Sequence, residues 1–126
     1  MENVIPLRGK NILGSALSPC CHKPKTGYYR DGFCFVGSDD AGNHSVCAIM
    51  TKEFLEFSVA QGNDLVTPFP EAGFPGLKPG DRWCLCAARW KQAYEAGVAP
   101  PIAPESTSSA ALDVVPLNII EKFILN

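Results

Sequence analysis

The segment that most constrains the fold of this chain is residues 62–80, which contain four glycines and four prolines. Residues of these two types mark turns and loops, and a stretch of this length without regular structure is unusual inside a compact domain. Four large apolar side chains are spaced along it: Leu65, Phe69, Phe74 and Leu77. We therefore expect an ordered loop that these side chains pin to the core.

A strand and a helix are predicted on each side of this loop. Residues 44–50 are small and apolar on both faces, which is typical of a covered strand. Thr51 then has the position of a helix N-cap, and Gly62 the position just after the last helical turn. Beyond the loop, residues 82–88 alternate as in a second strand, and residues 89–96 read as a second helix.

Three shorter elements complete the expected fold. They are a strand at 34–36, a short helix capped by Ser106 or Thr107, and a final helix from Pro116. Two strand–helix units with few strands in total indicate an α+β fold: a small sheet with helices mainly on one side, in two layers. A length of 126 residues fits one domain, which we expect to cover 1–126.

Charge and hydropathy narrow the class of protein. The net charge is −2 and there is no run of Lys or Arg, so we expect no nucleic-acid partner. No stretch approaches the ~20 apolar residues of a membrane-spanning helix. Residues 1–13 include Glu2, Arg8 and Lys10 and lack the apolar centre of an export leader, so we expect a cytoplasmic protein. The expected partner is a small molecule or another protein.

Six cysteines are many for a chain of this length. Without an export leader, free thiols are the expected state, and we predict that all six are reduced. Cys84 and Cys86 would share one face of a regular strand with β-carbons roughly 6–7 Å apart, too far for a disulfide. Because the paired spacing of zinc-binding cysteines is absent, we expect no metal and no cofactor.

The strongest candidate site lies on that strand face. Arg82 would share it with Cys84 and Cys86, and its charge would favour the thiolate form of a neighbouring cysteine. A covered arginine needs a partner, which Asp64 or Glu71 of the 62–80 loop would supply while the loop covers this face. The alternative is that both cysteines only pack as small apolar side chains.

Other residues extend the candidate list. Further candidates for catalysis are Cys34, Cys47 and His44; candidates for ligand binding are Arg30, Asp31, Asn63, Asp64, Trp83 and Arg89. His44 and Cys47 are three apart on a strand and face opposite ways, so they cannot form a nucleophile–base pair. Purely structural roles stay open, because a histidine after a turn often bonds to that turn and Asp or Arg near turns often cap or pair.

Three functions therefore compete. The first is a ligand or reactive-thiol pocket lined by Cys34, Cys47, Cys84 or Cys86 and covered by the 62–80 loop. The alternative is a non-catalytic interaction module that presents the aromatic and proline residues of the loop, and the third is a metal-stabilised structural domain. Buried Phe69 and Phe74 would favour the pocket, and exposed ones a partner surface. Whether the chain is an enzyme stays open.

Several strings resemble a known family. They are residues 26–34 (TGYYRDGFC), 42–51 (GNHSVCAIMT), 62–65 (GNDL), 74–86 (FPGLKPGDRWCLC), 89–90 (RW) and 96–101 (AGVAPP). With them the chain resembles the bacterial domain of unknown function 2237 family over residues 11–117. The resemblance implies a small α+β protein. It implies no established activity, cofactor or catalytic residue.

Overall fold

The structure is a computed structural model that describes residues 9–23 and 25–124. The predicted features at residues 1–8 and at Pro24 lie outside the described residues. Within the described part, a two-stranded antiparallel sheet pairs β1 (Val46–Ile49) with β2 (Arg82–Leu85). Both predicted strands are present, but each is shorter than expected. β2 ends at Leu85 because the chain then turns into a helix.

The predicted helix boundaries at Thr51 and Gly62 are confirmed. α1 (Lys52–Ala60) begins where Thr51 Oγ1 accepts a hydrogen bond from Phe54 N at 3.1 Å, and Gly62 follows with a left-handed φ of 89°. α2 is Ala87–Glu95 and α3 is Leu117–Ile120. Four short 3-10 turns complete the described part: η1 (Pro70–Ala72), η2 (Pro104–Ser106), η3 (Ser109–Asp113) and η4 (Glu121–Phe123).

Three local expectations were wrong. No strand forms at 34–36. The turn at 109–113 is capped by Ser108, whose Oγ accepts from Ala110 N at 3.1 Å, and not by Ser106 or Thr107. The final helix does start after Pro116, but of the three apolar residues expected to form its buried face, Leu117, Ile120 and Ile124, only Ile120 is fully buried, and Leu117 is exposed.

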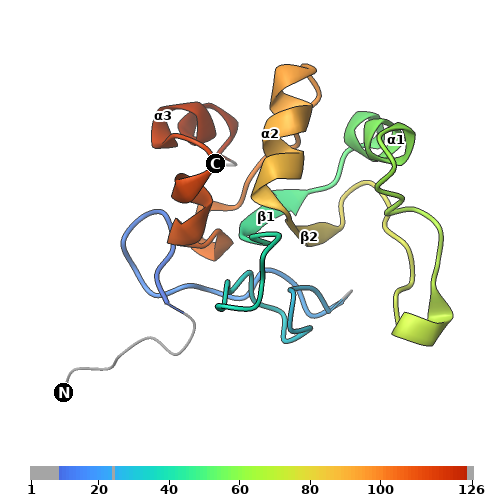
Figure 1. The fold of residues 1–126 in the computed structure, drawn as a ribbon, viewed down its shortest axis with the longest axis horizontal. Coiled ribbons are helices and arrows are strands. Elements are labelled where there is room, and N and C mark those ends of the chain that lie inside the picture. The colour runs from blue at the N-terminus through green and yellow to red at the C-terminus, as the bar shows by residue number, and fades with distance from the viewer. Residues whose placement is uncertain (1–8, 24, 125–126) are drawn as a thin grey trace.

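The elements form two layers about the β1–β2 ribbon, which confirms the α+β prediction. All three helices lie on one side of the ribbon, and the chain from residue 9 to residue 45 runs across the other side (Figure 1). We call these sides the helical face and the cysteine face. Strand alternation sends Trp83 and Leu85 to the helical face and Cys47 and Cys84 to the cysteine face.

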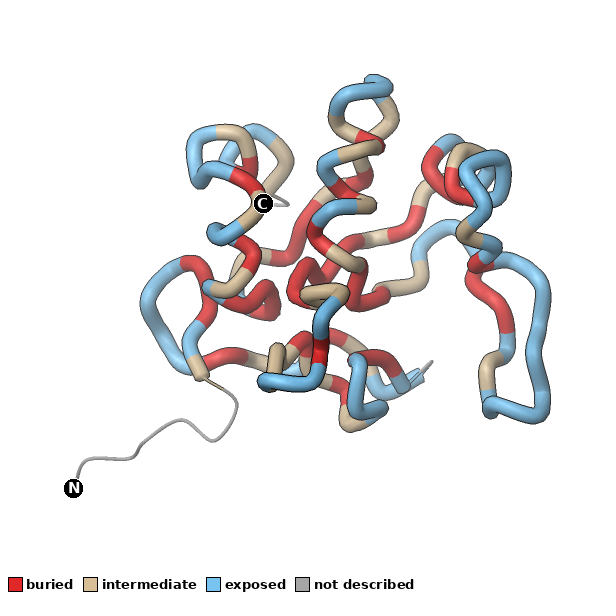
Figure 2. The backbone as a smooth tube through the Cα atoms, in the orientation of Figure 1, coloured by how far each residue is buried: buried red, intermediate tan, exposed pale blue. Residues whose placement is uncertain are grey.

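The main core fills the helical face. Trp90 of α2 lies at its centre, fully buried, with its indole N–H donated to the carbonyl of Pro100 at 3.0 Å. Its ring stacks on Tyr94 and meets the ring of Phe123 edge-on. Figure 2 shows buried residues along the sheet and along the parts of the helices that face it. No helix in the described residues is long and apolar enough to cross a membrane.

The 62–80 loop is ordered, as predicted, but one of its four expected anchors is not buried. Leu65 and Leu77 are buried and joined by a backbone hydrogen bond of 2.8 Å, and Phe74 packs edge-on against Trp83 with ring centroids 5.2 Å apart. Phe69 is 58% exposed, so its predicted anchoring role is wrong. Its backbone exchanges hydrogen bonds with that of Phe74, which closes the tip of the loop around η1.

Candidate functional site

The cysteine face is cross-linked by two disulfides. Cys20 is bonded to Cys47 and Cys34 to Cys84, with Cα–Cα distances of 5.7 and 5.2 Å. Among the described residues only Cys21 and Cys86 are free thiols. The prediction that all six cysteines are reduced is therefore wrong, and Cys34, Cys47 and Cys84 are not thiols in this state of the molecule. The exclusion of a Cys84–Cys86 bridge is confirmed.

The predicted lining of Arg82, Cys84 and Cys86 is also wrong as a unit. Arg82 and Cys84 share the cysteine face, but Cys86 lies past the end of β2 and is the N-cap residue of α2. Arg82 is half-exposed and pairs with Glu105 at 3.8 Å instead of with Asp64 or Glu71. The disulfide-linked segments that carry Cys20 and Cys34 cover this face, whereas the 62–80 loop packs on Trp83 at the helical face.

A cleft runs beside Trp83, between the 62–80 loop and the turns of residues 28–44. Three adjoining hollows all include Leu65 and Trp83, and the middle one has a volume of about 520 Å³. We call this the Trp83 cleft. Eight of the predicted site residues line it: Arg30, His44, Asn63, Asp64, Trp83, Cys84, Cys86 and Arg89. Arg82, Asp31, Cys34 and Cys47 are not among its lining residues.

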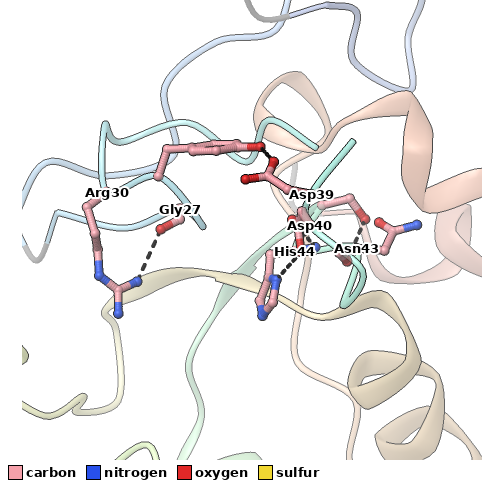
Figure 3. Close-up of polar contacts among 8 residues, drawn as sticks. Gly27, Arg30, Asp39, Asp40, Asn43 and His44 are labelled. Carbon is pink, nitrogen blue, oxygen red and sulfur yellow. Dashed lines mark hydrogen bonds and ion pairs between the residues drawn. The ribbon is translucent and has the colours of Figure 1, made fainter. Parts of the chain in front are cut away.

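Arg30 reaches over the floor of the cleft. Its guanidinium carbon lies 5.0 Å from the centroid of the Trp83 ring, and its Nη1 donates to the carbonyl of Gly27 at 3.1 Å (Figure 3). The backbone of Arg30 has a φ of 55°, a left-handed conformation that is rare for residues other than glycine, asparagine and aspartate. Strained conformations of this kind concentrate at functional sites. Five N–H donors on the guanidinium leave several to face the cleft.

His44 forms a pair with a buried carboxylate. Its Nδ1 lies 2.7 Å from Oδ1 of Asp40, and its backbone N–H donates to Oδ2 of the same side chain at 3.0 Å. Asn43 holds the turn with a left-handed φ of 52° and an Nδ2 donated to Ala110 O (Figure 3). Asp40 therefore orients the imidazole through Nδ1. The His44 side chain, which also carries Nε2, lines the cleft.

The far end of the cleft carries the free thiol of Cys86. Cys86 is partly exposed and shares one hollow with His44, Asn63 and Arg89. Arg89 is held by contacts to Gln61 O at 3.3 Å and Gln92 Oε1 at 3.4 Å. The cleft therefore combines two arginines, a histidine and one thiol around an aromatic floor.

Three candidate residues have structural roles instead. Asp64 accepts hydrogen bonds from the hydroxyl and N–H of Thr67 and from the N–H of Val66, and these bonds hold the pKa of its carboxyl below the usual range. Asn63 accepts the Ser58 hydroxyl through its backbone carbonyl at 2.6 Å. Asp31 accepts the N–H of Phe33 at 3.1 Å in a tight turn. The carboxylates of Asp31 and Asp64 and the backbone carbonyl of Asn63 therefore hold local turns.

Asp40, Tyr28 and Leu65 also belong to the site, although the sequence did not point to them as site residues. A signal for Asp40 was present, because an aspartate four residues before a histidine across an Asp-Ala-Gly-Asn turn can bond back to it. Tyr28, whose ring lies 5.6 Å from that of His44, gave no signal. Burial of both loop phenylalanines would have favoured a pocket, and exposure of both a partner surface. The two differ, because Phe74 packs on Trp83 while Phe69 is exposed at the rim of the Trp83 cleft.

Comparison with known proteins assigns the family and nothing further. A model of the family described as "Uncharacterized protein conserved in bacteria (DUF2237)" matches residues 10–124. The chain belongs to this family, as the strings of the sequence indicated. No curated protein matches the chain. The family has no described activity, so function has to be argued from the cleft and the cysteine face.

Proposed function

We propose that the Trp83 cleft binds a small ligand that carries an anionic group beside a flat apolar part. The observation that carries this proposal is the Arg30 guanidinium standing over the Trp83 ring inside the cleft. Guanidinium groups bind carboxylate or phosphate through paired N–H donors. The apolar side chains that line the same hollow, among them Leu65, Phe69 and Phe74, offer contact area for a flat group. Arg89 adds a second positive charge at the far end, while Asp64 uses its carboxylate within its own loop.

The Asp40–His44 pair supports the same proposal. When Nδ1–H is donated to Asp40, Nε2 is an acceptor that can orient a hydroxyl or amine of the ligand or take a proton from it. The buried carboxylate keeps the ring in one orientation, as a binding or acid–base group requires.

Benzoate is the simplest probe, with neutral benzyl alcohol as its matched control. We expect benzoate to shift the indole N–H signal of Trp83 in a two-dimensional NMR titration, and benzyl alcohol to shift it less. Arg30→Asn removes the charge and tolerates the left-handed backbone, so it should raise the benzoate Kd by about 10- to 100-fold, the value of a charge-assisted hydrogen bond. Arg82→Asn removes an arginine outside the cleft and should leave the Kd unchanged. The proposal fails if benzoate and phenyl phosphate both leave Trp83 unshifted, or if the two variants weaken binding equally.

A reactive thiol at Cys86 is a second candidate function. It is supported by Cys86 and His44 lining one hollow. If His44 assists ionisation of this thiol, His44→Gln should slow alkylation of Cys86 by iodoacetamide several-fold. Cys21, the other free thiol of the described residues, is the internal control and should react at an unchanged rate. Equal slowing at both cysteines, read by peptide mass spectrometry, would reject the candidate.

An interaction module remains the alternative, supported by the exposed Phe69. If a second copy of the chain occupies the loop tip, sedimentation should show a concentration-dependent rise in mass that Phe69→Ser abolishes.

We also propose that 1–126 forms one domain, which the continuous core from Ile12 to Ile120 supports. A cytoplasmic location is likewise a proposal; cell fractionation tests it, and there the two disulfides would be exposed to cytoplasmic thiols.

A further inference from the structure

Three of the four disulfide-bonded sulfurs lie close to one another, and the fourth, that of Cys84, is bonded to one of these three. Cys47 and Cys84 are direct partners in the β1–β2 register. The N–H of Cys47 donates to Thr107 Oγ1 at 3.1 Å, and the carbonyl of Cys47 accepts from Ala103 N at 2.9 Å. Cys47 and Cys84 therefore exchange no backbone hydrogen bonds with each other. In an antiparallel ribbon such a pair has its Cα atoms only about 4.5 Å apart, with the side chains closest together. The two strand cysteines therefore project side by side onto the cysteine face.

Each strand cysteine is bonded to one loop cysteine: Cys47 to Cys20, and Cys84 to Cys34. The Sγ atoms of Cys20, Cys34 and Cys47 all lie within 4.8 Å of one another, and Cys84 Sγ is bonded to Cys34 Sγ. All four residues are at most 5% exposed. Four sulfurs from three separate parts of the fold thus share one buried space.

The backbone around the cluster is held independently of the sulfur–sulfur bonds. Thr26 and Thr107 are fully buried, and their hydroxyls accept the N–H groups of Cys84 at 2.8 Å and of Cys47 at 3.1 Å. The N–H of Cys20 donates to Gly32 O at 2.7 Å. These contacts do not involve the sulfur–sulfur bonds, so they can also position the cysteine backbones around a bound cation, which is the support that a metal site needs around its ligands.

We propose that the reduced form of this cluster is a tetrahedral site for a thiophilic cation such as Zn²⁺, with Cys20, Cys34, Cys47 and Cys84 as its ligands. Thiolate sulfurs around zinc lie about 2.3 Å from the metal, which puts them roughly 3.8 Å from one another. Rotation of each side chain about its Cα–Cβ bond opens a disulfide to this distance. The sequence lacks the usual spacing of paired zinc-binding cysteines because these ligands come from separate loops and strands and not from one short turn.

The cysteine face passes from its disulfide-bonded form to its cation-bound form by reduction followed by binding. Two equivalents of a small dithiol donate four electrons and four protons, both disulfides open to four thiols, and the dithiols leave as cyclic disulfides. Binding of the cation then releases the thiol protons as the thiolates form. The inference does not depend on ligand binding at the Trp83 cleft, and it makes the cysteine face metal-bound under reducing conditions and cross-linked under oxidising ones.

The test is a metal titration of the full chain in its two redox states. Protein reduced with dithiothreitol and desalted without oxygen should bind one equivalent of Zn²⁺ against a chromophoric chelator, and Co²⁺ should give the intense visible bands of tetrahedral thiolate coordination. Oxidised protein should bind neither. Because four-ligand zinc sites owe their affinity to every ligand, Cys34→Ser or Cys47→Ser should weaken binding on the order of 100-fold.

Cys21→Ser and Cys86→Ser, which change the two free thiols, are the matched controls and should bind like the wild type. If the reduced chain is unfolded without metal, recovery of its circular dichroism on adding Zn²⁺ supports the proposal. A reduced chain that binds no metal, whether folded or unfolded, overturns it. Binding that Cys86→Ser abolishes and Cys34→Ser does not also overturns it.

Discussion

The helical face and the cysteine face of the β1–β2 ribbon are held by different interactions. On the helical face, large apolar side chains from three helices and the C-terminal turns surround Trp90. On the cysteine face, the buried apolar cluster consists of four cysteines and Ala103. The covering chain contributes two of these cysteines, Cys20 and Cys34, and has no helix or strand of its own. Burial of apolar area stabilises the first face, whereas covalent links and buried hydroxyl hydrogen bonds stabilise the second.

This contrast explains why so irregular a segment is ordered. Residues 9–45 bury too few large apolar side chains to offset the conformational entropy of an ordered chain. Two cross-links to the central strands reduce that entropy in the unfolded state, and they place the turns carrying Arg30 and His44 beside Trp83. The Trp83 cleft therefore depends on both faces: its floor belongs to the helical face and one wall to the cysteine face.

Removal of the cross-links should have the largest effect. The bridges span 50 residues (Cys34–Cys84) and 27 residues (Cys20–Cys47). Chain entropy assigns them about 4 and about 3.5 kcal/mol of unfolding free energy respectively. We expect Cys34→Ala/Cys84→Ala to lose more stability than Cys20→Ala/Cys47→Ala in urea unfolding with chelator present.

Hydrogen exchange locates that loss. Amides of residues 20–45 should lose protection in the first double variant while those of α2 keep theirs, because α2 is held by the helical face. Equal loss of protection in both regions would show that the two faces unfold as one unit and would remove the distinction.

Trp90→Ala should be the most damaging single change on the helical face. It empties the centre of the core and removes the indole N–H that Pro100 O accepts, at a cost of about 3–5 kcal/mol. Urea unfolding followed by circular dichroism measures it. Protection should now fall first in α2 and the C-terminal turns, the reverse of the pattern for the disulfide variants. A loss below about 1 kcal/mol would contradict the assignment of Trp90 to the centre of the core.

Thr107→Val tests the hydroxyl hydrogen bonds of the cysteine face. The Thr107 hydroxyl accepts from Cys47 N and donates to Ala103 O at 2.9 Å. Valine leaves the buried N–H of Cys47 unpaired, whereas Ala103 O keeps its hydrogen bond from Ser106 N at 3.2 Å. We expect a loss of about 1–3 kcal/mol in the same unfolding assay. Thr107→Ser keeps the hydroxyl and should lose about 1 kcal/mol, for the missing methyl group. If both variants lose the same amount, the methyl group and not the hydroxyl holds this segment.

The smallest effect concerns the surface turns of the cysteine face. The hydrogen bond from the Tyr29 hydroxyl to Asp39, followed by desolvation and nearby negative charge, raises the pKa of Tyr29 from 10.0 to about 12. Because this pKa is higher in the folded than in the unfolded chain, the phenol stabilises the fold fully below pH 10, and this contribution is lost as pH rises through 12.

Titration of tyrosinate absorbance in wild type and Asp39→Asn measures this shift. The variant should bring one tyrosine back toward the ordinary value. An unchanged titration would mean that residues 29 and 39 do not meet, and that this part of the cysteine face is less ordered than the rest.

Local chemistry accounts for what the sequence predicted correctly. Thr51 and Gly62 bound α1 because a side-chain oxygen and a left-handed glycine act within one helical turn. The alternation that placed Arg82 and Cys84 opposite Trp83 and Leu85 acts within one strand. Half of the residues that line the Trp83 cleft were also named as site candidates, because arginine, histidine and tryptophan near turns are common in binding sites, and their role in binding stays a prediction.

The same local pattern misplaced Cys86. Residues 82–88 alternate as a strand would, yet the chain leaves β2 at Leu85, and Trp90 of α2 is buried in the main core. Packing of Trp90 outweighs a strand preference worth about 1 kcal/mol or less. Cys86 therefore lies at the end of the Trp83 cleft and not on the cysteine face, where Cys84 is bonded to Cys34.

The sequence by itself determined the α+β class, the two ends of α1 and the family. Only the tertiary structure decided which cysteines meet, since Cys20 and Cys47 are 27 residues apart and Cys34 and Cys84 are 50 apart. Six cysteines allow many pairings that sequence cannot rank. The physical reason is that a cap or a turn depends on neighbours a few residues away, whereas the cysteine partners depend on the path of residues 9–45 across the ribbon, which the β1–β2 register and the buried Thr26 and Thr107 hydroxyls direct.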